Sequence, residues 1–480
     1  MDSVFRGTVR GLLLDYHLDM FTEIAAENFK SWRSLPSIEL GSVSAFLGPN
    51  SSGKTSLLQM LLLLKQTATS TDRTQVLQLG DDRTEVDLGS FQDLVYGHED
   101  GAELRLNARW KPPAAISVLD PNTEGQVLFD FDEIGFETVV GQTNGRLNVR
   151  HLEYRAGTNT VRMERIHSGV RLSNIEYGLV ATVAGRDHLR RTQGRNWPLP
   201  APVKCYGFPE EVSAYFQNSG FVGDLELEFE RQFTRRTFYL GPLRSMPLRQ
   251  YQWKGTHPDD VGEAGNRAIE ALLASRESGR TNARAYDARG HAKRRITVEQ
   301  HVAEWLKDIG LVDSFEMERI SSEADIYRVR VRLTPESTSV LLTDVGFGVS
   351  QILPVLVLLA YVPEGSTVLL EQPEIHLHPA VQSALADVII EAAKVRRVQV
   401  LVETHSEHLL RRFQLRVAEG KIAPDFLKLY FCSIRDGASN VESLDLNLFG
   451  EISNWPPGFF GDPLGETAAI ARAAFRRAAQ

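Results

Sequence analysis

The segment Gly48-Pro-Asn-Ser-Ser-Gly-Lys-Thr55 decides the fold of this chain. It matches the pattern G-x-x-x-x-G-K-[S/T] at every defined position. The apolar run Ser42–Leu47 precedes it and the leucine-rich run Thr55–Thr67 follows, so the motif joins a predicted strand to a predicted helix. In this context the loop amides and the helix N-terminus bind phosphate, and glycines keep Cβ atoms out of the way. A chance glycine-rich turn would not explain the flanking strand and helix.

The residues of this loop have distinct expected roles. Lys54 supplies a mobile positive charge for the β- and γ-phosphates, and the Thr55 hydroxyl is a magnesium ligand. The sequence therefore predicts a site for ATP and Mg²⁺. The residues expected to contact the nucleotide are Gly48, Asn50, Ser51, Ser52, Gly53, Lys54, Thr55 and Ser56.

A second segment, Thr367-Val-Leu-Leu-Glu-Gln-Pro-Glu374, has the form of a Walker B motif. Its apolar residues predict a buried strand, and parallel sheets bind ligands at the carboxyl ends of their strands. Glu371 stands at that end and is the expected magnesium ligand. The alternative, a surface acid that follows a buried strand by chance, is disfavoured by the intact phosphate-binding loop.

A third segment, Thr343–Gln351, lies shortly before the Walker B strand. It places glycines, including Gly348, ahead of Ser350 and Gln351 at the start of an apolar helix. The free amides of a helix N-terminus attract phosphate, so Ser350 and its neighbours are expected to meet the γ-phosphate of an ATP held by another protomer. An ordinary N-cap serine is the alternative.

A fourth segment, Val400–Ser406, is an apolar strand that ends in polar residues. We expect His405 to reach the γ-phosphate and Thr404 and Ser406 to line the site. The alternative is a structural histidine, but the position one strand after Walker B favours a functional one.

Two further interpretations rest on fewer residues. Gln92 is a candidate third magnesium ligand, with Asp93 as its competitor. A zinc cluster is the alternative use of the chain's late histidines, His376, His378, His405 and His408.

The order of these four motifs resembles the RecF/SMC/OLD-like branch of the ABC ATPases. The opening Asn28–Trp32 matches the start "NF(K/R)S" of that branch, and the HLH turn after Walker B fits its OLD-like members. Tyr239–Arg244 and Trp455–Phe460 resemble standalone bacterial ATPases, some of which act in anti-phage defence systems. The resemblance spans residues 20–110 and 235–462, and it implies two composite ATP sites in a head-to-tail homodimer or higher oligomer.

The chain departs from this resemblance at one catalytic position. Where ABC ATPases have the glutamate that polarises the attacking water, it has Gln372. A neutral amide orients water but accepts a proton poorly, so Glu374 is the alternative base. The expected catalytic residues are therefore Lys54, Glu371, Gln372, Glu374 and His405, and we expect slow hydrolysis or a switch that binds ATP and holds it.

The predicted fold class is α/β: an ABC-ATPase head with a parallel-sheet core, an antiparallel β subdomain, a β-rich insertion, a helical insertion and no coiled coil. Phe21–Asn28 and Ser37–Leu40 are predicted strands, and Ser275–Arg289 is a polar, mobile stretch. The predicted parts are a possible N-terminal extension (1–19), the N-lobe (20–95), the β-rich insertion (96–235), the helical insertion (236–312), the C-lobe (313–445) and a C-terminal tail (446–480).

Composition narrows the class of protein. The net charge of −9 does not favour a nucleic-acid binder on bulk charge alone. The two cysteines, Cys205 and Cys432, have no metal or redox spacing, which fits a reducing cytoplasm. No apolar run approaches the roughly 18–20 residues that a membrane helix needs, so no membrane partner is expected.

These observations predict an ATP-dependent assembly switch that controls a separate effector, most simply a nuclease, in bacterial defence. The alternative is a RecF-like clamp that binds DNA in repair, for which the arginine-rich segments Arg186–Arg195 and Arg284–Arg295 are the candidate surfaces. A transporter subunit is disfavoured by the large β-rich insertion.

Overall fold

The computed structural model describes residues 20–456, except 121–122, 124, 167–175, 195–196, 287–291 and 322–323, together with 472–474 and 477. The predicted N-terminal extension and most of the predicted tail therefore lie outside the described residues.

A six-stranded sheet forms the centre of the molecule, in the order β14-β21-β22-β3-β23-β24. The first five strands run parallel and β24 pairs antiparallel to β23. The strands are β14 (Thr237–Leu240), β21 (Thr367–Glu371), β22 (Gln399–Glu403), β3 (Val43–Leu47), β23 (Leu427–Arg435) and β24 (Ala438–Ser443). Strands β3, β21 and β22 are buried along their whole length because both faces of the sheet are covered. The predicted parallel core is confirmed.

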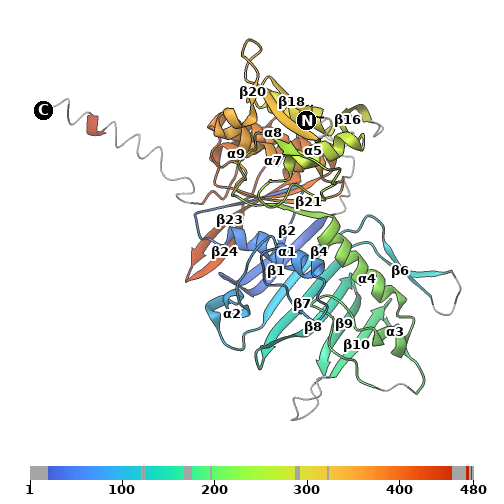
Figure 1. Cartoon of the computed structure of the whole chain (residues 1–480). Helices are drawn as coiled ribbons and strands as arrows, with labels where there is room; N and C mark the ends of the chain where they lie inside the picture. The colour runs from blue at the N-terminus through green and yellow to red at the C-terminus, as the bar shows by residue number, and fades with distance from the viewer. Residues whose placement is uncertain are drawn as a thin grey trace, which may run out of the picture.

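Helix α1 (Lys54–Thr69) lies between this sheet and a second one (Figure 1). Its leucines 57–64 share one hydrophobic core with Phe46, Leu369 and Leu401 of the parallel sheet and with Leu106 and Leu152 of the other. A helix that is covered on both sides needs apolar residues all round, which explains the leucine-rich run in the sequence, interrupted only by Gln59 and Met60.

The second sheet is antiparallel and has eight strands in the order β11-β10-β9-β8-β7-β4-β1-β2. They are β1 (Phe21–Phe29), β2 (Trp32–Glu39), β4 (Leu104–Trp110), β7 (Ile134–Thr143), β8 (Arg146–Ala156), β9 (Asn159–Ile166), β10 (Glu176–Val183) and β11 (Arg186–Asp187). Pairing of β4 with β1 makes the predicted β-rich insertion, 96–235, a continuation of the sheet that the N-lobe begins. Strand β2 starts earlier than predicted because Trp32 is fully buried and its Nε1 donates to Gly53 O, 3.1 Å away.

Helix α4 (Gly220–Glu230) and the π-helical turn η2 (Arg231–Arg235) contact α1 and pack on the antiparallel sheet (Figure 1). Phe229 and Phe233 meet the Trp110 ring there, with both pairs of ring centroids 6.0 Å apart. Smaller elements complete this lobe: α2 (Phe91–Leu94), η1 (Tyr96–His98), β5 (Ile116–Leu119), β6 (Val127–Phe131), β12 (Arg190–Arg191), α3 (Glu211–Tyr215) and β13 (Phe216–Gln217).

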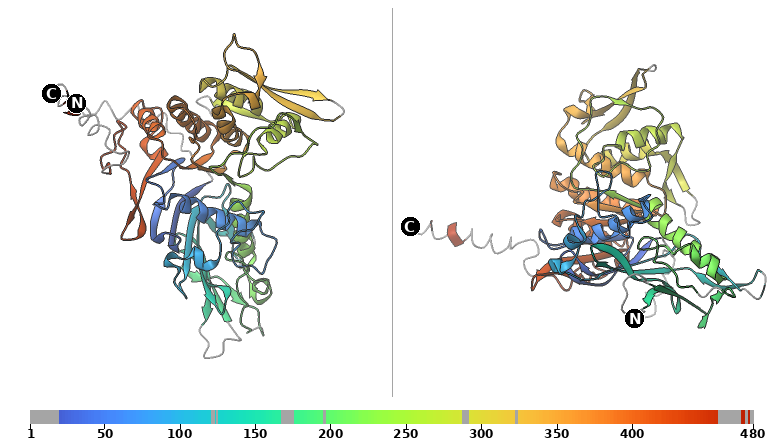
Figure 2. Two further views of the ribbon diagram at one scale, coloured as in Figure 1. Left: turned by 60° about the vertical axis from the view of Figure 1, so that its left-hand side comes forward. Right: turned by 60° about the horizontal axis from the view of Figure 1, so that its bottom comes forward.

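The opposite face of the parallel sheet carries a helical layer (Figure 2). Its helices are α5 (Ala268–Glu277), α6 (Val298–Asp308), α7 (Phe347–Tyr361), α8 (Pro379–Arg396) and α9 (Glu407–Ala418). The remaining elements are β15 (Tyr251–Gln252), β16 (Thr281–Tyr286), β17 (Ala292–Thr297), β18 (Ser314–Ser321), β19 (Ile326–Arg332), β20 (Val340–Leu341), η3 (Leu342–Asp344) and η4 (Pro424–Phe426).

Two sequence expectations about this layer need correction. Residues 236–312 are not wholly helical, since they also contain β14, β15 and the β16–β17 hairpin. The stretch predicted as polar and mobile, 275–289, begins with Ser275 buried in α5 and continues into β16. The longest described helix, α8, has 18 residues, too short for a coiled-coil arm. None of the described helices is long and apolar enough to cross a bilayer.

We expect truncation inside α1 to be costly because the helix has no exposed apolar side. Leu61→Ala, at a residue with 0% exposure, should lower the free energy of unfolding by about 2–5 kcal/mol in a denaturant titration. The matched control Leu415→Ala, at a helical leucine that is 44% exposed, should change it by less than about 1 kcal/mol. Equal losses in the two variants would contradict the burial of α1 between two sheets.

Candidate nucleotide site

Three of the four predicted motifs meet at one edge of the parallel sheet. The Gly48–Thr55 loop follows β3, Glu371 ends β21, and Glu403 ends the neighbouring β22. Glu371 lies in register with Glu403, and Glu403 with Phe46 on β3. The carboxyl ends of parallel strands form the usual ligand crevice of such a sheet.

The phosphate loop needs its glycines for space as well as for backbone conformation. Gly48 has φ 139°, and a Cβ there would lie 2.1 Å from Cys432 O. Gly53 has φ 91°, and a Cβ there would lie 2.3 Å from Ser439 Oγ. A side chain at either position would displace the loop from the strand β23–β24 hairpin beside it.

Lys54 is folded back over its own loop. Its Nζ donates to Gly48 O at 3.1 Å and to Pro49 O at 2.7 Å. Burial lowers the pKa of this ammonium, and the carboxylates of Glu403 and Glu374 oppose that effect. Neutral carbonyls are weaker partners for an ammonium than phosphate oxygens, so Lys54 can exchange them for a nucleotide.

Two buried carboxylates stand beside the loop. Thr55 Oγ1 donates to Glu403 Oε2 at 2.7 Å, and Glu403 is 2% exposed. Burial, and then the negative charge of Glu403, raise the pKa of Glu371 to about 7, although Tyr239 donates its hydroxyl to Glu371 Oε1 at 3.0 Å. Sequence reasoning gave Glu403 no role. The sequence feature that could have indicated a role for Glu403 is its position at the end of an apolar strand, which matches the position of Glu371 on β21.

This donor set fits magnesium. Thr55, Glu371 and Glu403 offer only oxygen atoms, and magnesium in nucleotide sites is held by one or two carboxylates together with phosphate oxygens. When bound, the ion would neutralise the facing carboxylates and the phosphate charge. Within the described residues, no group of three or more His, Cys, Asp or Glu side chains could hold a metal by itself.

The histidines after Walker B have structural roles here. The His376 ring packs edge-on against Phe347, with 5.1 Å between centroids. His378 caps α8, because its Nδ1 accepts from Ala380 N at 3.3 Å. They therefore do not form the alternative zinc cluster with His405 and His408 in the described part of the chain.

The Walker B turn, which follows β21, is hydrogen-bonded to the end of the neighbouring strand β22. Gln372 takes a left-handed conformation, φ 42°, and its backbone N–H donates to Glu403 O. Glu374 Oε1 accepts from Thr404 Oγ1 at 2.6 Å and from His405 N at 2.8 Å. Glu374 Oε2 is buried and has no hydrogen-bond partner among the described residues. Burial also raises the pKa of Glu374.

His405 lies against the phosphate loop. Its side chain is hydrogen-bonded to the Gly48 backbone, while burial and the charge of Lys54 lower its pKa. Ser406 is less available than expected, because its hydroxyl donates to Gln382 Oε1 and accepts from Leu409 N at the start of α9.

The signature segment begins α7 beside the Walker B turn. The N-cap is Gly346, which makes no side-chain cap, so the alternative of an N-cap serine at Ser350 is wrong. Ser350 lies in the first turn and donates to Phe347 O at 2.7 Å, and Gln351 Nε2 is buried without a partner among the described residues. Gly348 has room for a side chain, since a Cβ there would make only ordinary contacts.

Gln92 is not brought to the other site residues by any described contact. Its Nε2 donates to His98 O at 3.3 Å and to Asp100 Oδ1 at 3.4 Å on the same loop. Its competitor Asp93 completes a capping box with Ser90. Magnesium binding by Gln92 stays a prediction.

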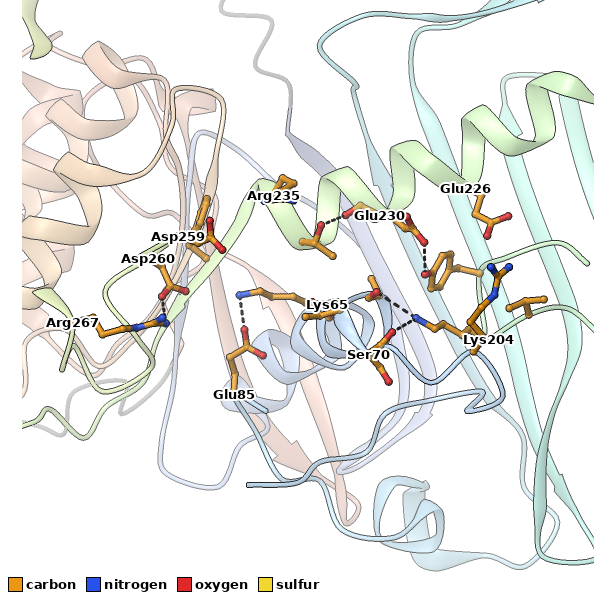
Figure 3. A pocket seen from close by; sticks show the side chains of 17 residues that line it. Lys65, Ser70, Glu85, Lys204, Glu226, Glu230, Arg235, Asp259, Asp260 and Arg267 are labelled. Carbon is orange, nitrogen blue, oxygen red and sulfur yellow. Dashed lines mark hydrogen bonds and ion pairs between the residues drawn. The ribbon is translucent and has the colours of Figure 1, made fainter. Parts of the chain in front are cut away.

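A cavity lies away from the nucleotide site, at the far end of α1 (Figure 3). Its volume is about 640 Å³. Lys204 Nζ caps α1 there by donating to Thr67 O and Ser70 O at 2.9 and 2.7 Å. The wall also contains the ion pairs Lys65–Glu85 and Arg267–Asp260. Because these charges satisfy one another, the cavity has no clear preference for a charged ligand.

The two arginine-rich segments differ in charge compensation. Arg284 forms ion pairs with Glu304, Asp308 and Glu391, and Arg294 pairs with Glu304. Arg186 and Arg190, by contrast, are exposed on β11 and β12. A DNA-binding surface is therefore disfavoured on the described part of the second segment.

Comparisons with known proteins support the ATPase assignment. Residues 253–411 match a family described as "AAA domain, putative AbiEii toxin, Type IV TA system", and residues 422–470 match a "Protein of unknown function (DUF3696)". The first match contains the signature, Walker B and switch segments, and the phosphate loop precedes it. Residues 253–411 are therefore similar to an AAA domain of the ATPase type. No curated protein sequence matches the chain.

The solved structures that match this chain include Smc head domains. An Smc head bound to the C-winged helix domain of ScpA has 13% identity and TM-score 0.45, covering 89% of this chain and 98% of that chain. A Pyrococcus furiosus structure, in which an Smc head with an extended coiled coil is bound to the C-terminal domain of ScpA, has 13% identity, TM-score 0.45 and coverages of 89% and 96%. The SMC head domain from Thermotoga maritima has 13% identity, TM-score 0.37 and coverages of 89% and 99%.

The Glu371 environment predicts a pH-dependent stability of the nucleotide-free protein. A carboxyl whose pKa rises on folding costs nothing below its unfolded pKa of about 4.5, and the cost grows until the pH passes about 7. Glu371→Gln should therefore raise the free energy of unfolding at pH 8 by about 1–3 kcal/mol and change it little at pH 4.5. Glu316→Gln, at an exposed position on β18, should have a small effect at both pH values. Denaturant titrations at the two pH values measure this, and a pH-independent gain would contradict the assignment.

Proposed function

We propose that this protein is an ATP-driven assembly switch in which two copies complete each other's ATP sites head to tail. The observation that carries the proposal is the convergence of Lys54, Thr55, Glu371, Glu403 and His405 at one sheet edge. The signature helix begins next to the Walker B turn with no side-chain cap, and Phe347 is 44% exposed. Uncapped N-terminal amides suit a phosphate that a second copy presents.

In this proposal each nucleotide is held by one copy and sensed by both. Lys54 would bind the β- and γ-phosphates, and Thr55, Glu371 and Glu403 would hold Mg²⁺. Gly348, Ser350 and Gln351 of the second copy would contact the γ-phosphate. The dimer would then control a separate effector, such as a nuclease, in defence. The family that residues 253–411 match is described as a toxin–antitoxin family, and this description supports a role in controlling an effector.

Hydrolysis in this proposal depends on Glu374 rather than on Gln372. Glu374 Oε1 is already bonded to Thr404 and His405, which leaves Oε2 to accept from the attacking water. Gln372 has only a neutral amide, and its backbone is held in the turn.

Glu374→Gln separates chemistry from binding. The amide oxygen can still accept from Thr404 and His405, but the group can no longer take a proton. We expect ATP turnover, measured as phosphate release, to fall by about 10²–10⁴-fold, with ATP affinity within about twofold of wild type. A turnover unchanged by Glu374→Gln but lost in Gln372→Ala would instead assign the water-orienting role to Gln372.

Mixing two inactive variants tests the composite site. Lys54→Ala removes the phosphate charge, and Gly348→Glu places a carboxylate in the signature segment where a Cβ fits. Neither variant can complete a site with a copy of itself, so the dimers in an equimolar mixture pair the two variants, and each such dimer has one intact site of two. Turnover should therefore recover to at most about half of the wild-type value. A mixture no more active than the separate variants would contradict shared sites.

A further inference from the structure

A partly buried arginine beside the Walker B turn has one buried donor atom without a partner among the described residues. Arg244 lies in the loop that follows β14, and its Nη2 donates to Glu371 O at 3.4 Å. Its Nη1 is buried and has no hydrogen-bond partner among the described residues. Burying an unpaired charged donor is costly, so such a group is expected to gain a partner in another state of the protein.

The loop holds this guanidinium in place from both sides. Gly241 N donates to Glu263 O and Ser245 N donates to Ala264 O, each at 2.8 Å, so Arg244 lies between two backbone anchors. Farther along, Arg249 Nη2 pairs with Asp344 Oδ1 at 2.8 Å, immediately before the signature helix. The loop thus connects the Walker B turn to the signature segment. Its backbone hydrogen bonds fix the position of the Arg244 backbone.

The neighbours of Arg244 define the chemistry that its free donor requires. The carboxylates of Glu371 and Glu374 and the Tyr239 hydroxyl surround it closely enough to raise its pKa, although burial lowers that pKa to about 10. Glu374 Oε2, another buried atom without a partner among the described residues, lies on the Walker B turn beside Arg244. An unpaired donor of positive charge and an unpaired acceptor of negative charge, both beside the Walker B turn, suit a phosphate oxygen on one side and its attacking water on the other.

We propose that Arg244 binds the γ-phosphate of ATP held by its own chain and so distinguishes ATP from ADP. This inference rests on the proposed function only in that the site takes ATP; it does not require the dimer. Arg244 follows β14, which pairs with β21, the strand that ends in Glu371, so the contact would form in cis, whereas the signature contact would come from a second copy. The guanidinium would stabilise the charge on the terminal phosphate, which ADP lacks.

The test compares nucleotide affinities without turnover. Dissociation constants for Mg²⁺ complexes of a non-hydrolysable ATP analogue and of ADP are measured by calorimetry for wild type, Arg244→Gln and Arg244→Lys. Arg244→Gln should weaken the analogue about 10–100-fold and change ADP by less than about twofold. Arg244→Lys should recover part of the loss. The control Met246→Ala, which removes an exposed side chain of the same loop, should change neither affinity.

The same measurements in the Gly348→Glu chain separate this inference from the proposed dimer. Loss of analogue affinity through Arg244→Gln in that background supports contact in cis, even if no dimer forms. Loss only in the chain with an intact signature would overturn the cis assignment. Equal weakening of both nucleotides would show that Arg244 only supports the fold of the site, and unchanged affinities would show that it does not contact the nucleotide; either result overturns the inference.

Discussion

The register between β21 and β22 is the constraint on which this site depends. Parallel pairing sets Glu371 beside Glu403, and both carboxylates are buried. Burial, and then the repulsion between the two charges, raise the pKa of Glu371. The fold tolerates this repulsion by surrounding the pair with Thr55, Tyr239 and the cations of Lys54 and Arg244. Such a site favours a divalent cation together with a polyanion.

Helix α1 connects the nucleotide site to both sheets of the molecule. Its first residue is Lys54, and its last turn is capped by Lys204 from the antiparallel lobe. Since its leucines are packed against both sheets, a shift of the phosphate loop would have to move one sheet relative to the other. The antiparallel sheet is therefore part of the mechanical frame of the nucleotide site and not an appendage to it.

Local spacing made the phosphate loop, the Walker B strand and the switch strand predictable. Each is a short apolar run followed at once by polar residues, and the structure brings them together. Glu403 and Arg244 were missed because their roles depend on strand register and on the path of a loop between distant segments. The continuity of the antiparallel sheet was missed for a similar reason, since β4 joins β1 across more than 70 residues of chain. The β16–β17 hairpin has an arginine-rich sequence that resembles an exposed helix.

The central claim is that ATP, and not ADP, holds two copies together through sites that both copies complete. The most direct measurement is the molecular mass of the Glu374→Gln chain in solution without nucleotide, with Mg²⁺ and ADP, and with Mg²⁺ and ATP. We expect monomers in the first two conditions and dimers or larger multiples in the third, with no dimers in a chain that also carries Lys54→Ala. A mass that is the same in all three conditions would contradict an ATP-driven assembly.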